Sequence, residues 1–302
     1  MITKGRRNYG ETKSISTGHV FEAIFYWKTV KQCWEYLAAL RWKNGYVCPK
    51  CGCRHAYPLS NGRYQCSECR YQISVTAGTV LHKTHMPLTK WFLAFYFVCY
   101  DKRGISAVQL ASMIGTTYKT AWYMLVRIRS AMGQRDATHQ LSGVIEFDDA
   151  YFGVPTVGQK WGRGTEKASV FVALSLSARG NPRYLKVQVT PDIKGETVKK
   201  FAESAFVEGS TIRSDGYSSY IPALTNFTHE HTPYDPNSDL LHWLHIAISN
   251  AKAFILGTYH GLPKKNLQSY LDEYSFRFSR RSFGPKLLER LTLAVGTSAR
   301  LS

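Results

Sequence analysis

Two Cys-x-x-Cys pairs constrain the fold of this chain more than any other feature. Cys48 and Cys51 form the first pair, and Cys66 and Cys69 form the second about fifteen residues later. Each pair offers two thiolates from one tight turn, and four thiolates together satisfy a tetrahedral zinc ion. The spacing predicts a zinc ribbon over residues 41–80. The Zn²⁺ would be structural, because four protein ligands leave no open position for chemistry.

The charge of the chain indicates a polyanionic partner. Lysine and arginine outnumber the acidic residues by 39 to 21, which gives a formal net charge of +18. These basic residues are spread over the whole length, which favours nucleic acid as the partner. The longest apolar run, 91–100, is too short to cross a bilayer, and the N-terminus has no apolar signal segment. We expect a soluble cytoplasmic protein that binds DNA and no membrane, with reduced cysteines.

Helical patterns flank the predicted ribbon. Residues 1–40 begin with a basic arm, and the apolar residues from 21 to 40 recur at helical spacing. Residues 86–134 are typical of a helix-turn-helix, because one predicted helix ends at Gly115 and a second begins directly after it. The first turn of that second helix would reach base edges, so candidate DNA contacts are Tyr118, Lys119 and Thr120. Helical hairpins that bind nothing share this pattern.

From residue 142 onward the pattern changes to strands, and two of them end in an acidic residue. Asp148 ends the apolar strand 144–148, and Asp215 follows the short strand 211–214. Three strands, a crossover helix over 196–206 and a fourth strand predict a mixed sheet, in which the tips of the first and fourth strands can lie side by side. A solvated turn after the strand is the alternative interpretation of the first acid.

The alternation of side chains along the first strand sorts its acids. Asp148 shares a face with Glu146, whereas Asp149 shares the other face with Phe147. A pair formed by Asp148 and Asp215 could bind Mg²⁺ or Mn²⁺. Two such ions about 4 Å apart can activate an attacking oxygen and stabilise a leaving one on phosphorus.

A basic, glycine-rich loop lies between the first two strands. It spans residues 158–164 and includes Lys160 and Arg163. These two residues are candidate phosphate contacts, and a solvated hairpin loop is the alternative.

The residues after the sheet resemble a known family. Residues 248–261, Ile-Ser-Asn-Ala-Lys-Ala-Phe-Ile-Leu-Gly-Thr-Tyr-His-Gly, are similar to the signature of the ISXO-like bacterial insertion-sequence transposases. The block 266–278, the acidic motif 146–153 and the N-terminal zinc ribbon are similar to the same group. The resemblance extends over about residues 20–281.

This resemblance implies an RNase H-like catalytic domain of the DDE type over 142–281, followed by a C-terminal tail over 282–302. The catalytic residues that it carries over, all but the last as metal ligands, are Asp148, Asp215, Asn250 and the accessory basic residue Lys252. Three positions depart from the usual family pattern. Asn250 and Asp149 stand where relatives often have glutamate, and Ser279 stands where they usually have asparagine.

A predicted helix over 241–256 constrains which of these side chains can share a site. Asn250 and Lys252 are two residues apart, which separates them by about 200° around a regular helix. We therefore expect Asn250 to face the metal ions and Lys252 to contact the DNA backbone beside them. His245 lies about 140° from Asn250 and is expected to support the site or the fold without binding metal.

These features together predict a multidomain α+β protein with a zinc ribbon, a helix-turn-helix segment and an RNase H-like α/β domain containing a mixed sheet. The resemblance implies a transposase of the bacterial nucleoid that binds terminal inverted repeats, frees a 3′-hydroxyl and joins it to target DNA. Because two ends must be held together, a homodimer or larger assembly is expected. Two alternatives stay open: a zinc-ribbon DNA-binding regulator with an inactive nuclease-like domain, and a metal-dependent nuclease without strand transfer.

Overall fold

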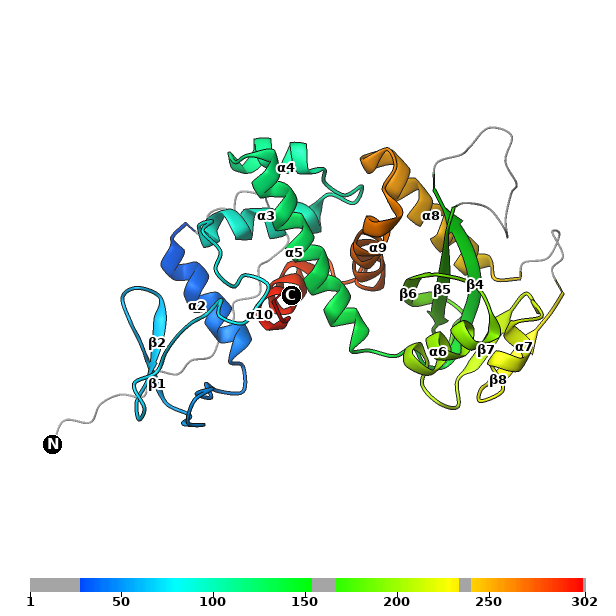
Figure 1. Cartoon of the computed structure of the whole chain (residues 1–302), viewed down its shortest axis with the longest axis horizontal. Helices are drawn as coiled ribbons and strands as arrows, with labels where there is room; N and C mark the ends of the chain where they lie inside the picture. Colours follow the sequence, from blue (N-terminus) through cyan, green and yellow to red (C-terminus); the bar gives the residue numbers. More distant parts are fainter. Residues whose placement is uncertain (1–27, 154–166, 234–239, 301–302) are drawn as a thin grey trace.

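The computed structural model of this 302-residue chain describes residues 28–153, 167–233 and 240–300. A small ribbon lies at one end, helices fill the middle, and a mixed α/β domain lies at the other end (Figure 1). The expected basic arm and the first part of the helix predicted over 21–40 lie outside the described residues. None of the described helices has the combination of length and hydropathy that a bilayer crossing requires.

The ribbon is a three-stranded antiparallel sheet beside helix α2 (Val30–Arg41). Its strands are β1 (Ala56–Pro58), β2 (Arg63–Cys66) and β3 (Gln72–Ser74). The turn between β1 and β2 contains Gly62 at φ +76°, where a Cβ would lie 2.4 Å from the ring of Trp34 in α2. Glycine is therefore required twice over, for the left-handed backbone and for the close approach of the indole.

Helix α2 shares one apolar core with α3 (Leu88–Tyr100), α4 (Ala107–Ile114), α5 (Tyr118–Ala137) and α10 (Lys286–Thr297). Helices α4 and α5 occupy the positions predicted for the helix-turn-helix. Ser106 and Thr117 cap their N-termini, and Gly115 adopts a left-handed conformation between them. The turn thus has the local chemistry from which it was predicted.

Helix α10 occupies the region that was expected to be only a C-terminal tail. Its residues Leu291, Ala294 and Val295 are fully buried in the core of the N-terminal helices. The chain end returns to the same core, because the carbonyl of Ser298 accepts a hydrogen bond from the backbone N–H of Val80 at 3.1 Å. This region is helical because its apolar residues between 288 and 295 recur at the spacing of one buried helix face.

The α/β domain is built on a five-stranded sheet with the order β6-β5-β4-β7-β8. Its strands are β4 (Val144–Phe152), β5 (Ala168–Leu176), β6 (Pro182–Thr190), β7 (Thr211–Ser214) and β8 (Thr228–His231). Strands β4, β5 and β6 pair antiparallel, whereas β7 is parallel to β4 and β8 is parallel to β7. Helix α6 (Gly195–Ala205) makes the crossover between β6 and β7. The predicted mixed sheet is confirmed.

Two details of this sheet differ from the prediction. Strand β4 does not end at Asp148 but continues to Phe152, because its last residues pair with the beginning of β5. The short fifth strand, β8, was not predicted. Its sequence, Thr-His-Glu-His, has neither apolar residues nor clear alternation, and its pairing with β7 places it at the edge of the sheet.

Helices cover both faces of the sheet and form two separate cores (Figure 1). On one face, Phe147 packs with residues of α6 and α7 (Tyr220–Ala223). On the other, Ala150 and Phe152 pack with α8 (His242–Tyr259) and α9 (Lys264–Ser279). The predicted alternation of faces along β4 is therefore confirmed.

Helix α9 joins the α/β domain to the helical core, since it packs against both β6 and α5. Arg129 of α5 and Glu273 of α9 form an ion pair of 2.8 Å, with side chains 1% and 0% exposed. The Arg129 guanidinium also lies 3.7 Å from the ring centroid of Tyr270, and Arg277 contacts Glu273 at 3.1 Å. The buried charges are thus compensated on several sides, which is the condition for such a pair to be tolerated.

We expect the loss of one partner of this ion pair to be more damaging than the loss of both. Glu273→Ala leaves the Arg129 guanidinium buried without its carboxylate and should lower the free energy of unfolding by about 3–5 kcal/mol. Replacing both residues by apolar ones, Arg129→Met with Glu273→Leu, should cost less. Urea unfolding measures both, with the exposed pair variant Glu196→Ala as a control. A double variant as unstable as Glu273→Ala would contradict this expectation.

Candidate active site and zinc cluster

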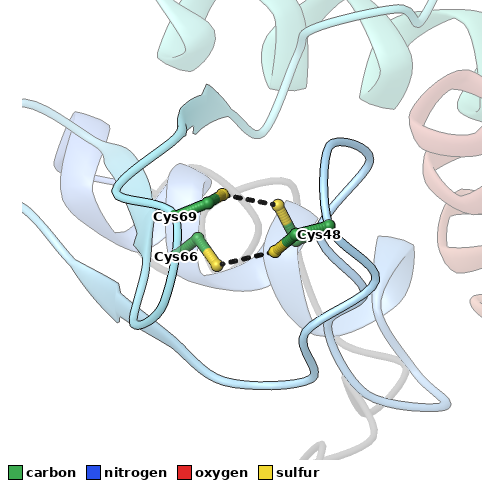
Figure 2. Close-up of side chains that lie close together, drawn as sticks. Cys48, Cys66 and Cys69 are labelled. Carbon is green, nitrogen blue, oxygen red and sulfur yellow. Dashed lines mark hydrogen bonds between the residues drawn. The ribbon is translucent and has the colours of Figure 1, made fainter.

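Four cysteine sulfur atoms converge in the ribbon. The Sγ atoms of Cys48, Cys51, Cys66 and Cys69 all lie within 4.8 Å of one another. The Cys48–Cys69 and Cys51–Cys66 sulfur distances are both 3.6 Å, close to the ~3.8 Å expected for two sulfurs on one tetrahedral zinc ion. Figure 2 shows the labelled sulfur atoms of Cys48, Cys66 and Cys69 turned toward one another. The set fits a structural zinc ion.

The backbone around Cys48 favours the thiolate of this residue, which is the form that binds metal. Burial disfavours the Cys48 thiolate, but hydrogen bonds from the backbone N–H groups of Lys50 and Cys51 outweigh it and lower the pKa of Cys48 to about 6. Cys53, which was not predicted as a ligand, has its sulfur 3.3 Å from the hydroxyl of Ser67. Within the described part of the chain, this cysteine set is the one group of three or more His, Cys, Asp or Glu side chains arranged to hold a metal ion.

Asp148 and Asp215 lie at the same level of two neighbouring parallel strands. The register pairs Glu146 of β4 with Arg213 of β7, and the two aspartates each follow two residues later. Because neighbouring strands lie ~4.8 Å apart, this register brings Asp148 close to Asp215, which follows directly after the end of β7. Burial is the largest cause of the raised pKa of Asp148, and the charges of Asp149 and Asp215 raise it further.

Helix α8 places His245 next to Asp148. The Nε2 atom of His245 lies 3.7 Å from Oδ2 of Asp148, and the side chains are 47% and 17% exposed. Its interaction with Asp148 raises the pKa of His245, although partial burial opposes the shift. The pair therefore borders solvent on one side and the buried strand on the other.

Asn250 leaves helix α8 in a different direction from His245. Five residues separate the two, which is about 140° around the helix, and Asn250 is exposed. Lys252 is seven residues from His245, about 20° around the helix, and therefore lies on the same side. Its Nζ atom is 5.8 Å from the ring centroid of Phe152 at the end of β4. Burial and the nearby charge of Lys167 both lower the pKa of Lys252.

The residues predicted to contact DNA have different surroundings. Tyr118 and Lys119 are exposed in the first turn of α5, with Tyr118 58% exposed. The hydroxyl of Thr120 lies 3.0 Å from that of Thr117, whose oxygen also accepts the backbone N–H of Thr120, so Thr120 helps to form the helix cap. Lys160 and Arg163 lie outside the described residues.

Two buried contacts beside Asp148 were not predicted. The carboxylate of Glu146 accepts a hydrogen bond from the backbone N–H of Leu244 at 2.8 Å, and the hydroxyl of Tyr220 donates one to Asp149 at 2.6 Å. Burial and the neighbouring carboxylates raise the pKa of Tyr220 well above its usual range, so its hydroxyl remains a donor. The alternation of side chains along β4 indicated that Glu146 faces the same side as Asp148, where α8 lies. Nothing in the sequence connects Asp149 with Tyr220.

Comparison with known proteins accounts for both the ribbon and the α/β domain. Residues 140–279 match the ISXO2-like transposase domain family, and residues 28–72 match the transposase zinc-ribbon domain family. A protein described as an uncharacterized protein in transposable element ISH50, from Halobacterium salinarum, is 26% identical over 267 residues. The alignment covers 80% of this chain and 88% of that protein.

Two solved structures of Mos1 transposase also align with the chain. One is a pre-cleavage Mos1 transpososome, at 10% identity and a TM-score of 0.28 over 67% of this chain and 78% of that chain. The other is a paired-end complex with the left transposon end, at 11% identity and a TM-score of 0.30 over 69% of this chain and 79% of that chain. Alignments this loose add nothing to the family matches. Those two matches show that residues 28–72 are similar to a transposase zinc-ribbon domain and that residues 140–279 are similar to an ISXO2-like transposase domain.

Proposed function

We propose that this chain is a transposase that binds the terminal inverted repeats of its own element, hydrolyses a phosphodiester at each end and joins the resulting 3′-hydroxyl to target DNA. The observation that supports the proposal is the parallel register of β4 and β7, in which Glu146 pairs with Arg213 and each aspartate follows two residues later. The strongly basic protein would attract the negatively charged DNA backbone, and the carboxylates would supply the ligands for the metal ions that act on a phosphodiester.

The donor set of this site fits a divalent cation. Asp148 and Asp215 offer hard oxygen ligands of the kind that Mg²⁺ and Mn²⁺ prefer. A cation between them would offset the burial and the neighbouring negative charges that together raise the pKa of Asp148. We assign the metal site, with two ions, to these carboxylates. Such ions, when bound, supply activation of the attacking oxygen and stabilisation of charge at phosphorus.

We assign the third position of the site to helix α8 and favour His245 over Asn250 there. The support is the 3.7 Å contact between His245 and Asp148, together with the different direction in which Asn250 leaves the helix. A neutral imidazole can ligate a metal ion or accept a proton, and His⁺ can contact phosphate. Lys252, on the same side of α8, would hold the DNA backbone beside the reacting phosphate.

The ribbon and the helix-turn-helix would hold the DNA end. Tyr118 and Lys119 are exposed where a recognition helix contacts base edges, and the +18 charge would supply salt-dependent affinity. Lys160 and Arg163 stay proposed phosphate contacts of the loop after β4. Because two ends must be processed together, we propose a homodimer or larger assembly on DNA.

The aspartate pair is tested by cleavage of a labelled element end with Mg²⁺ or Mn²⁺. Asp148→Asn and Asp215→Asn should each lower the cleavage rate by more than about a hundredfold, because each removes a charged ligand whose effect on the transition state is worth several kcal/mol. The exposed variant Glu203→Gln should cut like the parent.

Three outcomes separate the proposal from its alternatives. Aspartate variants that cut like the parent contradict the site assignment. Tight end binding by a parent that never cuts indicates a regulator, and cutting without joined products indicates a plain nuclease.

The zinc cluster is tested by metal content and end binding. Cys66→Ser removes one of four ligands, so the chain should lose its bound zinc and at least about tenfold of its affinity for element ends, because the ribbon depends on the metal for its fold. The matched variant Cys53→Ser should keep one zinc per chain. End affinity that survives zinc removal by a chelator would show that the ribbon does not take part in end binding.

The third position is tested by comparing two residues on α8. His245→Ala should slow cleavage by about ten- to a hundredfold, whereas Asn250→Ala should stay within about threefold of the parent. Single-turnover cleavage at saturating metal measures both. The reverse order of effects would return the third position to Asn250.

A further inference from the structure

Strand β4 supplies the missing cap of helix α8. The N-cap position is Leu241, whose side chain cannot accept a hydrogen bond and whose backbone is left-handed at φ 57°. The backbone N–H of Leu244 in the first turn instead donates to the carboxylate of Glu146 at 2.8 Å. An acidic group at a helix N-terminus both pairs a free N–H and complements the helix dipole. The contact fixes the first turn of α8, which carries His245, over β4.

The opposite face of β4 packs against α7, the helix that follows the turn carrying Asp215. This turn leads into α7, and the backbone N–H of Tyr217 donates to Oδ1 of Asp215 at 3.0 Å. Tyr220 follows, fully buried, and its hydroxyl donates to Oδ1 of Asp149 at 2.6 Å. The Tyr220 ring also packs against Phe147 at a centroid distance of 4.9 Å. The Asp215 turn is therefore tied to β4 from behind the sheet.

We infer that Glu146 and Asp149 are positioning residues, which tie α8 and the Asp215 turn, respectively, to the strand that carries Asp148. The inference rests on the proposed function, because the groups that it positions are those assigned to the metal site. Neither residue needs to touch metal or DNA. Glu146 is 6% exposed and bound to α8, and Asp149 faces the core behind the sheet.

The length of the side chain separates positioning by Glu146 from metal binding. Glu146→Gln removes the charge but keeps an oxygen at the same reach, so the bond to Leu244 persists. Glu146→Asp keeps the charge but is one methylene shorter, so the bond is lost.

For the contact between Tyr220 and Asp149, Tyr220→Phe removes the donor whereas Asp149→Asn keeps an acceptor. Tyr96→Phe is the matched control, because the buried Tyr96 hydroxyl has no hydrogen-bond partner among the described residues.

The experiment measures hydrogen exchange peptide by peptide and the Mn²⁺ concentration that gives half-maximal cleavage, both on the full-length protein. Glu146→Asp should speed exchange in residues 242–246 by about tenfold, and Tyr220→Phe should do so in residues 215–224. Each should raise the half-maximal Mn²⁺ concentration by about ten- to a hundredfold. Glu146→Gln, Asp149→Asn and Tyr96→Phe should stay within about threefold of the parent.

Two results would overturn the inference. One is unchanged exchange in both segments, and the other is a Glu146→Gln variant that loses its Mn²⁺ response while Glu146→Asp retains it, as a metal ligand would. Exchange does not depend on catalysis. A parent that fails to cleave therefore rejects the proposed function, while the exchange pattern still supports or overturns the positioning role.

Discussion

The parallel pairing of β4 with β7 is the constraint on which the rest of the site depends. Strand β7 ends at Ser214, whereas β4 continues to Phe152 with β5 on its other side. Asp148 is therefore held within a paired strand, while Asp215 stands at the end of its strand, where the chain turns. The sheet opens on one side of Asp148, and this opening is where helix α8 brings His245. Because the proposed site lies where β7 ends, a ligand could reach Asp148 without a cavity inside the core.

Three acids within four residues of one strand would repel one another in an apolar interior, and their directions resolve the conflict. Glu146 and Asp149 point to opposite faces, and each accepts a hydrogen bond from the element that covers its face. Asp148 is left facing the opening with His245. The pleat thus separates Asp149 from the two acids on the other face, and there the hydrogen bond from Leu244 compensates Glu146 while His245 lies beside Asp148.

The sequence predicted those features that depend on local chemistry. The cysteine spacing, the caps and glycine of the helix-turn-helix, the apolar strands and the alternation along β4 each reflect a short-range physical rule. The strand β8 was missed because its edge position comes from pairing, and α10 was missed because an apolar stripe does not reveal the core that it joins. The choice between His245 and Asn250 depends on how α8 is rotated above the sheet. That rotation is set by contacts such as Glu146 with Leu244, which lie 98 residues apart.

Helix α10 gives the fold an unusual order of assembly. The helices that support the helix-turn-helix enclose Leu291 and Val295, so their core includes residues synthesised after the whole α/β domain. A ribosome that has released α4 and α5 still has to translate about 150 further residues before this core is complete. A product that terminates early, before residue 286, would lack the α10 side chains that pack in the same core as α4 and α5. The core around α4 and α5 can thus be complete only after α10 has been synthesised.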